Sequence, residues 1–210
     1  DLSFIEDQAG LLNGTVRQTV SASFTPGLTP EPLLASLQRY PYGCTEQTVS
    51  VALPLLLSDA FGGLPGMDET DRLATLQASV DKLLGRQDVN GAFGLWRAQS
   101  GDFWLDAYVT DFLGRARTAG HSVPDIAFRS ALDNLTNRVN TAPDFDSGGA
   151  DIAYALYVLA REGAASMGDL RYYADVKAGA FSTALAQAQL GAALAAYGDQ
   201  TRADAMFARA

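Results

Sequence analysis

The residues best suited to chemistry lie together in residues 40–47, which read YPYGCTEQ. The single cysteine of the chain, Cys44, stands three residues before Gln47. At this spacing the sulfur can meet the side-chain amide carbon of Gln47 across one tight turn. Attack by the sulfur would expel ammonia and leave an internal thioester, which is far more electrophilic than an amide. An amine or hydroxyl that reached this acyl group would become bound to Gln47 and would release Cys44 as a thiol.

The neighbouring residues are suited to positioning and protecting this pair. Pro41 fixes its own φ, and Gly43 can adopt backbone angles that other residues avoid. A helix predicted to begin near Thr45 would aim unpaired N–H groups and a partial positive charge at the sulfur and at the oxyanion formed during attack. Tyr40 and Tyr42 flank the motif. They are candidates to shield a thioester from water, and equally they could simply pack the turn against the next helix.

Three other residues have both a functional and a structural interpretation. Glu46 could orient an incoming amine, although an acidic residue in a first helical turn more often complements the helix dipole. Trp96 and Trp104 flank a loop that we place opposite the motif. We expect them to anchor this loop in the core rather than to contact a ligand.

The composition suits one ordinary soluble domain, because 210 residues with 48% hydrophobic and 19% charged can bury a substantial core. The net charge is −9 without a cluster of Lys and Arg, which argues against nucleic acid and against direct contact with an acidic membrane. One cysteine excludes an internal disulfide, and one histidine excludes most zinc sites. The acidic pairs Asp68/Glu69 and Asp144/Asp146 do not follow a calcium-loop pattern. We therefore expect no metal and no other cofactor.

Helical periodicity dominates the chain after residue 28. Residues 15–24 are β-prone, so we interpret residues 1–28 as a leader from a preceding β-rich domain that could supply a short strand. Residues 29–210 form the main domain, which we expect to be all-α and part of a longer protein. The pattern predicts helices at 31–39, 45–61, 69–86, 103–118, 125–139, 150–162, 180–197 and 199–209. Pro54 falls inside the second of these and should kink it.

A loose internal repeat indicates an array of helix pairs. The residues around Tyr108 recur around Tyr154, 46 positions later, in a similar apolar helix, and residues 189–198 give a shorter third copy. A period near 40 residues is typical of stacked helical hairpins, arranged either as an open solenoid or as a closed ring. Each apolar helix would line the interior, and a more polar partner would cover it.

Several motifs resemble those of the bacterial α2-macroglobulins. The YPYGCTEQ run is followed by TVS, and the resemblance continues through NGAFGLW at residues 90–96, FWLDAYV at 103–109, DIAYALY at 151–157 and GDLRYY at 168–173. It covers residues 28–210. A Cys-x-x-Gln alone is a weak signal, but with its YPYG leader it is specific. The resemblance implies a thioester-containing domain with an α/α-toroid fold, like the one that complement proteins use for covalent tagging.

The resemblance also implies a function for the parent protein, which would be a broad-spectrum endopeptidase inhibitor rather than an enzyme. In this family a protease cuts a bait region elsewhere in the chain, the molecule rearranges, and lysine amines of the protease attack the acyl group on Gln47. The implied partners are target proteases and the other domains of the parent chain. The bacterial members are implied to lie in the periplasm, anchored to a membrane, as a defence of the cell envelope.

Three alternatives stay open at this stage, and one is a glycosidase with paired carboxylates at the mouth of an α/α ring. Cys44 could be the nucleophile of a hydrolase or transferase, which would need a base, and the single histidine, His121, is the available candidate. The chain could instead be a helical-repeat binding module in which Cys44 is inert. Some complement relatives use a histidine to pass the acyl group to hydroxyls. His121 matches no such position and is expected in an exposed loop, so we predict direct aminolysis with amines preferred over hydroxyls.

Overall fold

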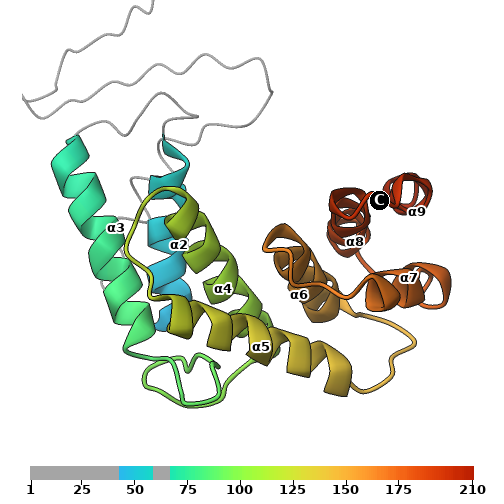
Figure 1. Ribbon diagram of the computed structural model, residues 1–210, viewed down its shortest axis with the longest axis horizontal. Helices are drawn as coiled ribbons and strands as arrows, with labels where there is room; N and C mark the ends of the chain where they lie inside the picture. Colours follow the sequence, from blue (N-terminus) through green and yellow to red (C-terminus); the bar gives the residue numbers. More distant parts are fainter. Residues whose placement is uncertain (1–42, 59–66) are drawn as a thin grey trace, which may run out of the picture.

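The computed structural model describes residues 43–58 and 67–210, and these ranges are built from helices (Figure 1). The helices are α2 (Thr45–Leu56), α3 (Glu69–Leu84), α4 (Phe103–Thr118), α5 (Asp125–Thr141), α6 (Ala150–Arg161), α7 (Met167–Asp175), α8 (Ala184–Ala196) and α9 (Gln200–Phe207). Within the described residues, β-structure is confined to two isolated bridges. The predicted all-α class is therefore confirmed. The helix expected at 31–39 and the leader at 1–28 lie outside the described residues.

The helices form two layers of successive hairpins. The even-numbered helices contact one another in chain order, α2 with α4, α4 with α6, and α6 with α8. The odd-numbered helices flank this row, since α3 packs on α2 and α4, α5 on α4 and α6, and α9 on α8 (Figure 1). The hairpins α2–α3, α4–α5 and α8–α9 thus pair an inner helix with a covering partner, as the repeat predicts, whereas α7 packs on α8 and α9.

The inner helices are buried on most of their surface, whereas the outer helices are buried along one stripe, in agreement with their hydrophobic patterns. In α6 eight of the twelve residues are buried, so this inner helix is apolar nearly all round. In the outer helix α3 the buried residues are Leu76, Val80 and Leu83, which form one stripe with helical spacing. Small residues such as Ala107 and Ala153, both fully buried, allow the inner helices to approach closely.

Most helices begin at a side-chain cap. Asp68, Asp102 and Thr183 each accept a hydrogen bond from the N–H group three residues ahead. The cap at Thr183 starts α8 at Ala184, so the helix predicted from residue 180 begins too early. Helix α2 ends at Leu56, two residues after Pro54, and turns at Leu57, so the predicted continuation through residue 58 is also wrong.

Helix α7 is an element that the periodicity did not predict. It begins at the cap Ser166, whose Oγ accepts a hydrogen bond from the N–H of Asp169 at 3.3 Å. Its buried residues are Leu170 and Tyr173. A nine-residue helix offers too few turns for a strong periodic signal, and Gly168 near its start weakens the helical preference. The Ser-x-x-Asp cap was the signal that could have found it.

The inner layer depends on tight packing, and Leu135 of α5 tests this dependence. The side chain is fully buried in the hydrophobic cluster that extends from α4 to α9. Truncation to alanine removes apolar contacts and leaves a cavity, so we expect Leu135→Ala to lower the free energy of unfolding by about 3 kcal/mol. Urea denaturation followed by circular dichroism measures this change. The matched control is Leu185→Ala on the surface of α8, which we expect to change stability by no more than about 0.5 kcal/mol. Equal losses in the two variants would contradict the packing described here.

Candidate functional site

Cys44 and Gln47 meet at the start of α2 through two reciprocal hydrogen bonds. Cys44 is the N-cap residue, and its Sγ accepts a hydrogen bond from the backbone N–H of Gln47 at 3.4 Å. In return, the backbone N–H of Cys44 donates to Oε1 of Gln47 at 3.3 Å. This is a capping box in which cysteine takes the place of serine or threonine. The box holds the sulfur and the carboxamide within the same turn, as the three-residue spacing predicts.

The loop between α3 and α4 is hydrogen-bonded to the residue that follows the buried cysteine. Cys44 is only 6% exposed. The next residue, Thr45, donates its backbone N–H to the Leu95 carbonyl at 2.9 Å and its hydroxyl to the Gly94 carbonyl at 2.6 Å. Thr48 donates its hydroxyl to the Cys44 carbonyl at 2.8 Å. The first turn of α2 is therefore tied both to itself and to a distant loop.

The position of this loop corrects the sequence-based expectation for both tryptophans. Residues 94–95 contact the motif directly, so the loop does not lie opposite it. Trp96 is 61% exposed and Trp104 is 38% exposed, so neither is a core anchor. The loop is instead anchored through backbone carbonyls. Trp104 lies in the first turn of α4, where its ring is 4.7 Å from that of Tyr108.

A buried carboxylate holds the other end of the loop. Asp106 of α4 is fully buried and accepts the backbone N–H of Phe93 at 2.7 Å. Its second oxygen accepts from Asn134 at 3.0 Å and lies 3.0 Å from Arg138, both on α5. Burial raises the pKa of Asp106, although these three partners act in the opposite direction. Asp106 therefore connects the motif's covering loop to the α4–α5 hairpin.

Arg86 is a second connection that the sequence did not indicate. It follows α3, and its Nη2 donates to the Gly43 carbonyl at 2.6 Å. Its Nη1 donates to Oγ1 of Thr45 at 3.1 Å. The planar guanidinium thus spans the residues on both sides of Cys44. A single basic residue after a helix carries no pattern that would distinguish this role from helix-dipole stabilisation.

Gly43 leaves room for a side chain of another helix. A Cβ built at this position would lie 2.4 Å from Nζ of Lys82 and 3.5 Å from its Cε. Glycine is therefore needed for the close approach of the Lys82 side chain. Lys82 and Gly43 line a cavity of about 330 Å³ together with Gln47, Thr48, Val51, Thr75, Ala78 and Ser79.

Glu46 takes part in a series of hydrogen bonds that leads to the inner helix α4. Its Oε1 accepts a hydrogen bond from the hydroxyl of Ser50 at 2.7 Å, and this hydroxyl lies 3.1 Å from that of Tyr108 on α4. Burial raises the pKa of Tyr108, and the charge of Glu46 acts in the same direction. Glu46 is thus more than a complement to the helix dipole.

His121 lies near the opposite end of α2 from Cys44. It is half-buried in the turn between α4 and α5, not fully exposed as expected. Desolvation, and then the charge of Arg72, lowers its pKa. Arg72 donates to the Leu55 carbonyl at 2.9 Å, and Leu55 is three helical turns beyond Cys44, roughly 16 Å along the axis. The structure therefore does not bring this histidine to the cysteine.

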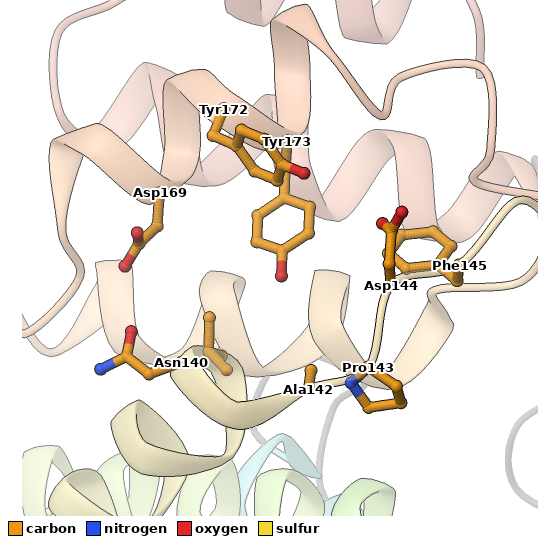
Figure 2. A pocket seen from close by; sticks show the side chains of 9 residues that line it. Asn140, Ala142, Pro143, Asp144, Phe145, Asp169, Tyr172 and Tyr173 are labelled. Carbon is orange, nitrogen blue, oxygen red and sulfur yellow. The ribbon is translucent and has the colours of Figure 1, made fainter.

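Two further hollows are formed by other elements. One, of about 280 Å³, lies between the end of α5 and α7, where Figure 2 shows Asp169 and Asp144 on either side of Tyr173. Asp144 lies 2.5 Å from Nζ of Lys177, an ion pair that lowers the pKa of this carboxyl. The other hollow, of about 340 Å³, is lined by aromatic residues of α4 and α6, including Tyr108 and Tyr154.

Not every expectation falls on the described residues. Tyr40 and Tyr42 lie outside them, so their shielding role stays a prediction.

Within residues 43–58 and 67–210 there is no cluster of three or more His, Cys, Asp or Glu side chains that could hold a metal ion. Asp68 caps α3, and Glu69 pairs with Arg72 at 2.7 Å. In the same ranges, every helix is too short or too polar to cross a bilayer.

The chain belongs to the A-macroglobulin TED domain family, whose model matches residues 15–141. An alpha-2-macroglobulin of Escherichia coli K12 is 36% identical over 93% of this chain, which spans 13% of that protein. Salmonella alpha-2-macroglobulin reacted with methylamine has a similar structure, with a TM-score of 0.73 and 32% identity over 83% of this chain and 12% of that one. The structure of trypsin-activated alpha-2-macroglobulin from Escherichia coli is also similar, with a TM-score of 0.71 and 33% identity. This match covers 80% of the present chain and 13% of that one. The chain thus spans about an eighth of the length of these relatives.

The raised pKa of Asp106 predicts a pH-dependent contribution to stability. Because the native state binds this proton more tightly than the unfolded chain does, Asp106 favours folding most at low pH. This contribution is lost as the pH rises through the native pKa. We expect the free energy of unfolding of the wild type, minus that of Asp106→Asn, to fall as the pH rises above the pKa of an ordinary aspartate, about 3.9. Urea titrations of both proteins at pH values from below to above this pKa measure the difference. A constant or rising difference would contradict the assignment.

Proposed function

We propose that this chain is the thioester-containing domain of a bacterial α2-macroglobulin-like endopeptidase inhibitor. The observation that carries the proposal is the reciprocal pairing of Cys44 with Gln47 at the N-terminus of α2. In this proposal residues 29–210 form the domain, and residues 1–28 come from the preceding one. The chain spans about an eighth of each relative, so the proposed domain would be one part of a longer protein.

The geometry supports both formation and opening of a thioester. The Cys44 sulfur attacks the amide carbon of Gln47, a C–S bond forms, and the amide nitrogen leaves as ammonia. When an amine attacks later, a C–N bond forms at the same carbon, the C–S bond breaks, and Cys44 leaves as a thiolate that takes up a proton. In both steps negative charge develops on the oxygen that the Cys44 N–H contacts at 3.3 Å.

The surroundings of the sulfur suit a bond that must survive in water. Cys44 is buried, and the loop carbonyls bonded to Thr45 hold residues 94–95 over the first turn of α2. Arg86 fixes the residue before the cysteine. Burial of the sulfur slows hydrolysis because water cannot approach the thioester from the side that the loop covers. Tyr40 and Tyr42 would add to this shield from outside the described residues.

The relatives support amines and proteases as the reactants. One similar structure is an alpha-2-macroglobulin reacted with methylamine, and another is an alpha-2-macroglobulin activated by trypsin. By this likeness, the parent of the present chain would capture proteases through their lysine amines after bait cleavage. It would act in the periplasm of a bacterium, anchored to the membrane by another part of the chain.

A cysteine enzyme is the weaker hypothesis. Nucleophilic cysteines are activated by an adjacent base, usually a histidine. The one histidine of the sequence lies at the far end of α2, and the carboxylate closest in sequence, Glu46, is bonded to Ser50. Covalent capture, with Cys44 as the leaving group, needs no such base on the protein.

The proposal predicts a mass change and a masked thiol in the full-length protein. We expect the intact mass to be lower than the sequence mass by one ammonia. Added methylamine should join Gln47 and release one thiol at Cys44 that iodoacetamide can alkylate. Peptide mass spectrometry locates both changes. The matched variant Cys44→Ala should keep the Gln47 amide and take up no methylamine.

Two other results would contradict the proposal. A native protein with a free Cys44 thiol and an intact Gln47 amide would indicate the inert helical-repeat module. Stronger labelling of Gln47 by glycerol than by methylamine would contradict direct aminolysis.

The Arg86 clamp predicts a change in the lifetime of the thioester. Removing the guanidinium leaves the Gly43 carbonyl without its partner and loosens the turn before Cys44. We therefore expect Arg86→Met to raise the rate of spontaneous thiol release in buffer by roughly tenfold, with Arg86→Lys intermediate. The release is followed with a thiol-reactive dye in the absence of amine. An unchanged rate in Arg86→Met would show that the clamp does not protect the bond.

A further inference from the structure

We propose that Lys82 is a catalytic residue for opening of the thioester, because its ammonium stabilises the negative charge that develops on the Gln47 acyl oxygen. This inference rests on the proposed function of Cys44 and Gln47. It adds Lys82 to the Cys44 N–H as a second group that stabilises the oxyanion. The oxyanion would then receive one hydrogen bond from the main chain and one interaction from a charged side chain.

The first support is the contact between Lys82 and the motif. Lys82 lies in the last turn of α3, and its Nζ would be 2.4 Å from a Cβ built on Gly43. The ammonium therefore occupies the space that the missing side chain of Gly43 leaves free. Gly43 immediately precedes Cys44, whose N–H donates to Oε1 of Gln47. This oxygen stands for the acyl oxygen of a thioester.

The second support is the cavity that the two residues share. Lys82 and Gln47 both line the hollow of about 330 Å³ between α2 and α3. Its walls are short side chains, among them Val51, Ala78 and Thr75, which leave room for a small alkylamine. On α2, Thr45 faces the loop and Glu46 faces Ser50 and the inner helix α4. The α3 side is therefore the side from which Gln47 borders open space.

The third support is the charge of Lys82, which is not committed elsewhere in the described part of the chain. There it has no carboxylate within ion-pair distance, whereas Lys177 is paired with Asp144. The neighbouring Asp81 instead accepts a hydrogen bond from Gln77 at 2.9 Å. Lys82 therefore brings the positive charge and the N–H donors of an ammonium group to the cavity.

The charge acts at one defined point of the reaction. A neutral amine attacks the acyl carbon, and the carbonyl electron pair moves to the oxygen. The Cys44 N–H and the Lys82 ammonium stabilise this oxyanion. The electron pair then returns, the C–S bond breaks, and the thiolate leaves while the added nitrogen gives up its proton to solvent. Lys82 keeps its own proton throughout, so it acts by charge and not by proton transfer.

The test is the rate of thiol release from the full-length protein in excess methylamine, at fixed pH and ionic strength. Loss of one buried oxyanion donor costs a hundredfold or more in other systems, and Lys82 is exposed, so we expect Lys82→Met to be about tenfold slower. Lys82→Arg keeps the charge and should stay within roughly threefold of the wild type. The matched control Lys177→Met removes a lysine outside the cavity and should react at the wild-type rate.

Gly43 provides an independent variant. The added methyl group of Gly43→Ala meets the flexible end of the Lys82 side chain, which can move away without disturbing the backbone. We expect this variant to fold and to react as slowly as Lys82→Met. The double variant should be no slower than either single one, because each removes the same interaction. Rates that multiply in the double variant would overturn the assignment.

The outcomes separate this inference from the function on which it rests. A wild-type protein without ammonia loss or amine-released thiol refutes the proposed function itself. A wild type that reacts, with Lys82→Met equally fast, refutes only the role of Lys82. If Lys82→Met does not form the thioester but Lys82→Arg does, the role of Lys82 is supported, because formation also passes through an oxyanion on this oxygen. Failure of Lys82→Arg as well would show that packing, not charge, is required.

Discussion

The reciprocal hydrogen bonds between Cys44 and Gln47 are the interaction on which the site depends. They use the N–H groups that a helix leaves unpaired at its first turn, so the start of α2 supplies the geometry without additional residues. A cysteine cap is weaker than a serine cap because sulfur is a poor acceptor. Additional contacts compensate for this weakness. Arg86 holds the residue before the cysteine, and Thr45 ties the residue after it to the loop.

The first turn of α2 presents each residue of the motif to a different neighbour. Thr45 faces the loop of residues 94–95, Glu46 faces Ser50 and α4, and Gln47 borders the cavity beside α3. Successive residues of a helix are separated by about 100° around the axis, which follows from 3.6 residues per turn. Four consecutive residues can therefore cap the helix, dock the loop, contact the inner layer and carry the acyl group.

The layered hairpins place these neighbours. Because α2 packs on both α3 and α4, its N-terminus lies between the end of an outer helix and the loop that leads to the next inner helix. Asp106 connects this loop to α5 through Phe93 and Asn134. These hydrogen bonds and Arg138 offset only part of the desolvation of its carboxylate, so its pKa stays raised. The site thus rests on the α2–α5 part of the double layer, and the hairpins α6 to α9 extend the inner row.

The sequence alone determined the features that are local. The Cys-x-x-Gln spacing, the all-α class and the alternation of inner and covering helices depend on residues a few positions apart or on a regular period. The tertiary structure decided the rest. Arg86 reaches Gly43 across 43 residues, and Thr45 reaches the loop across 49, contacts that leave no periodic signal. The requirement for glycine at position 43 was equally hidden. It arises from a side chain on another helix, and a sequence does not state which distant residue will fill the space that a missing Cβ leaves.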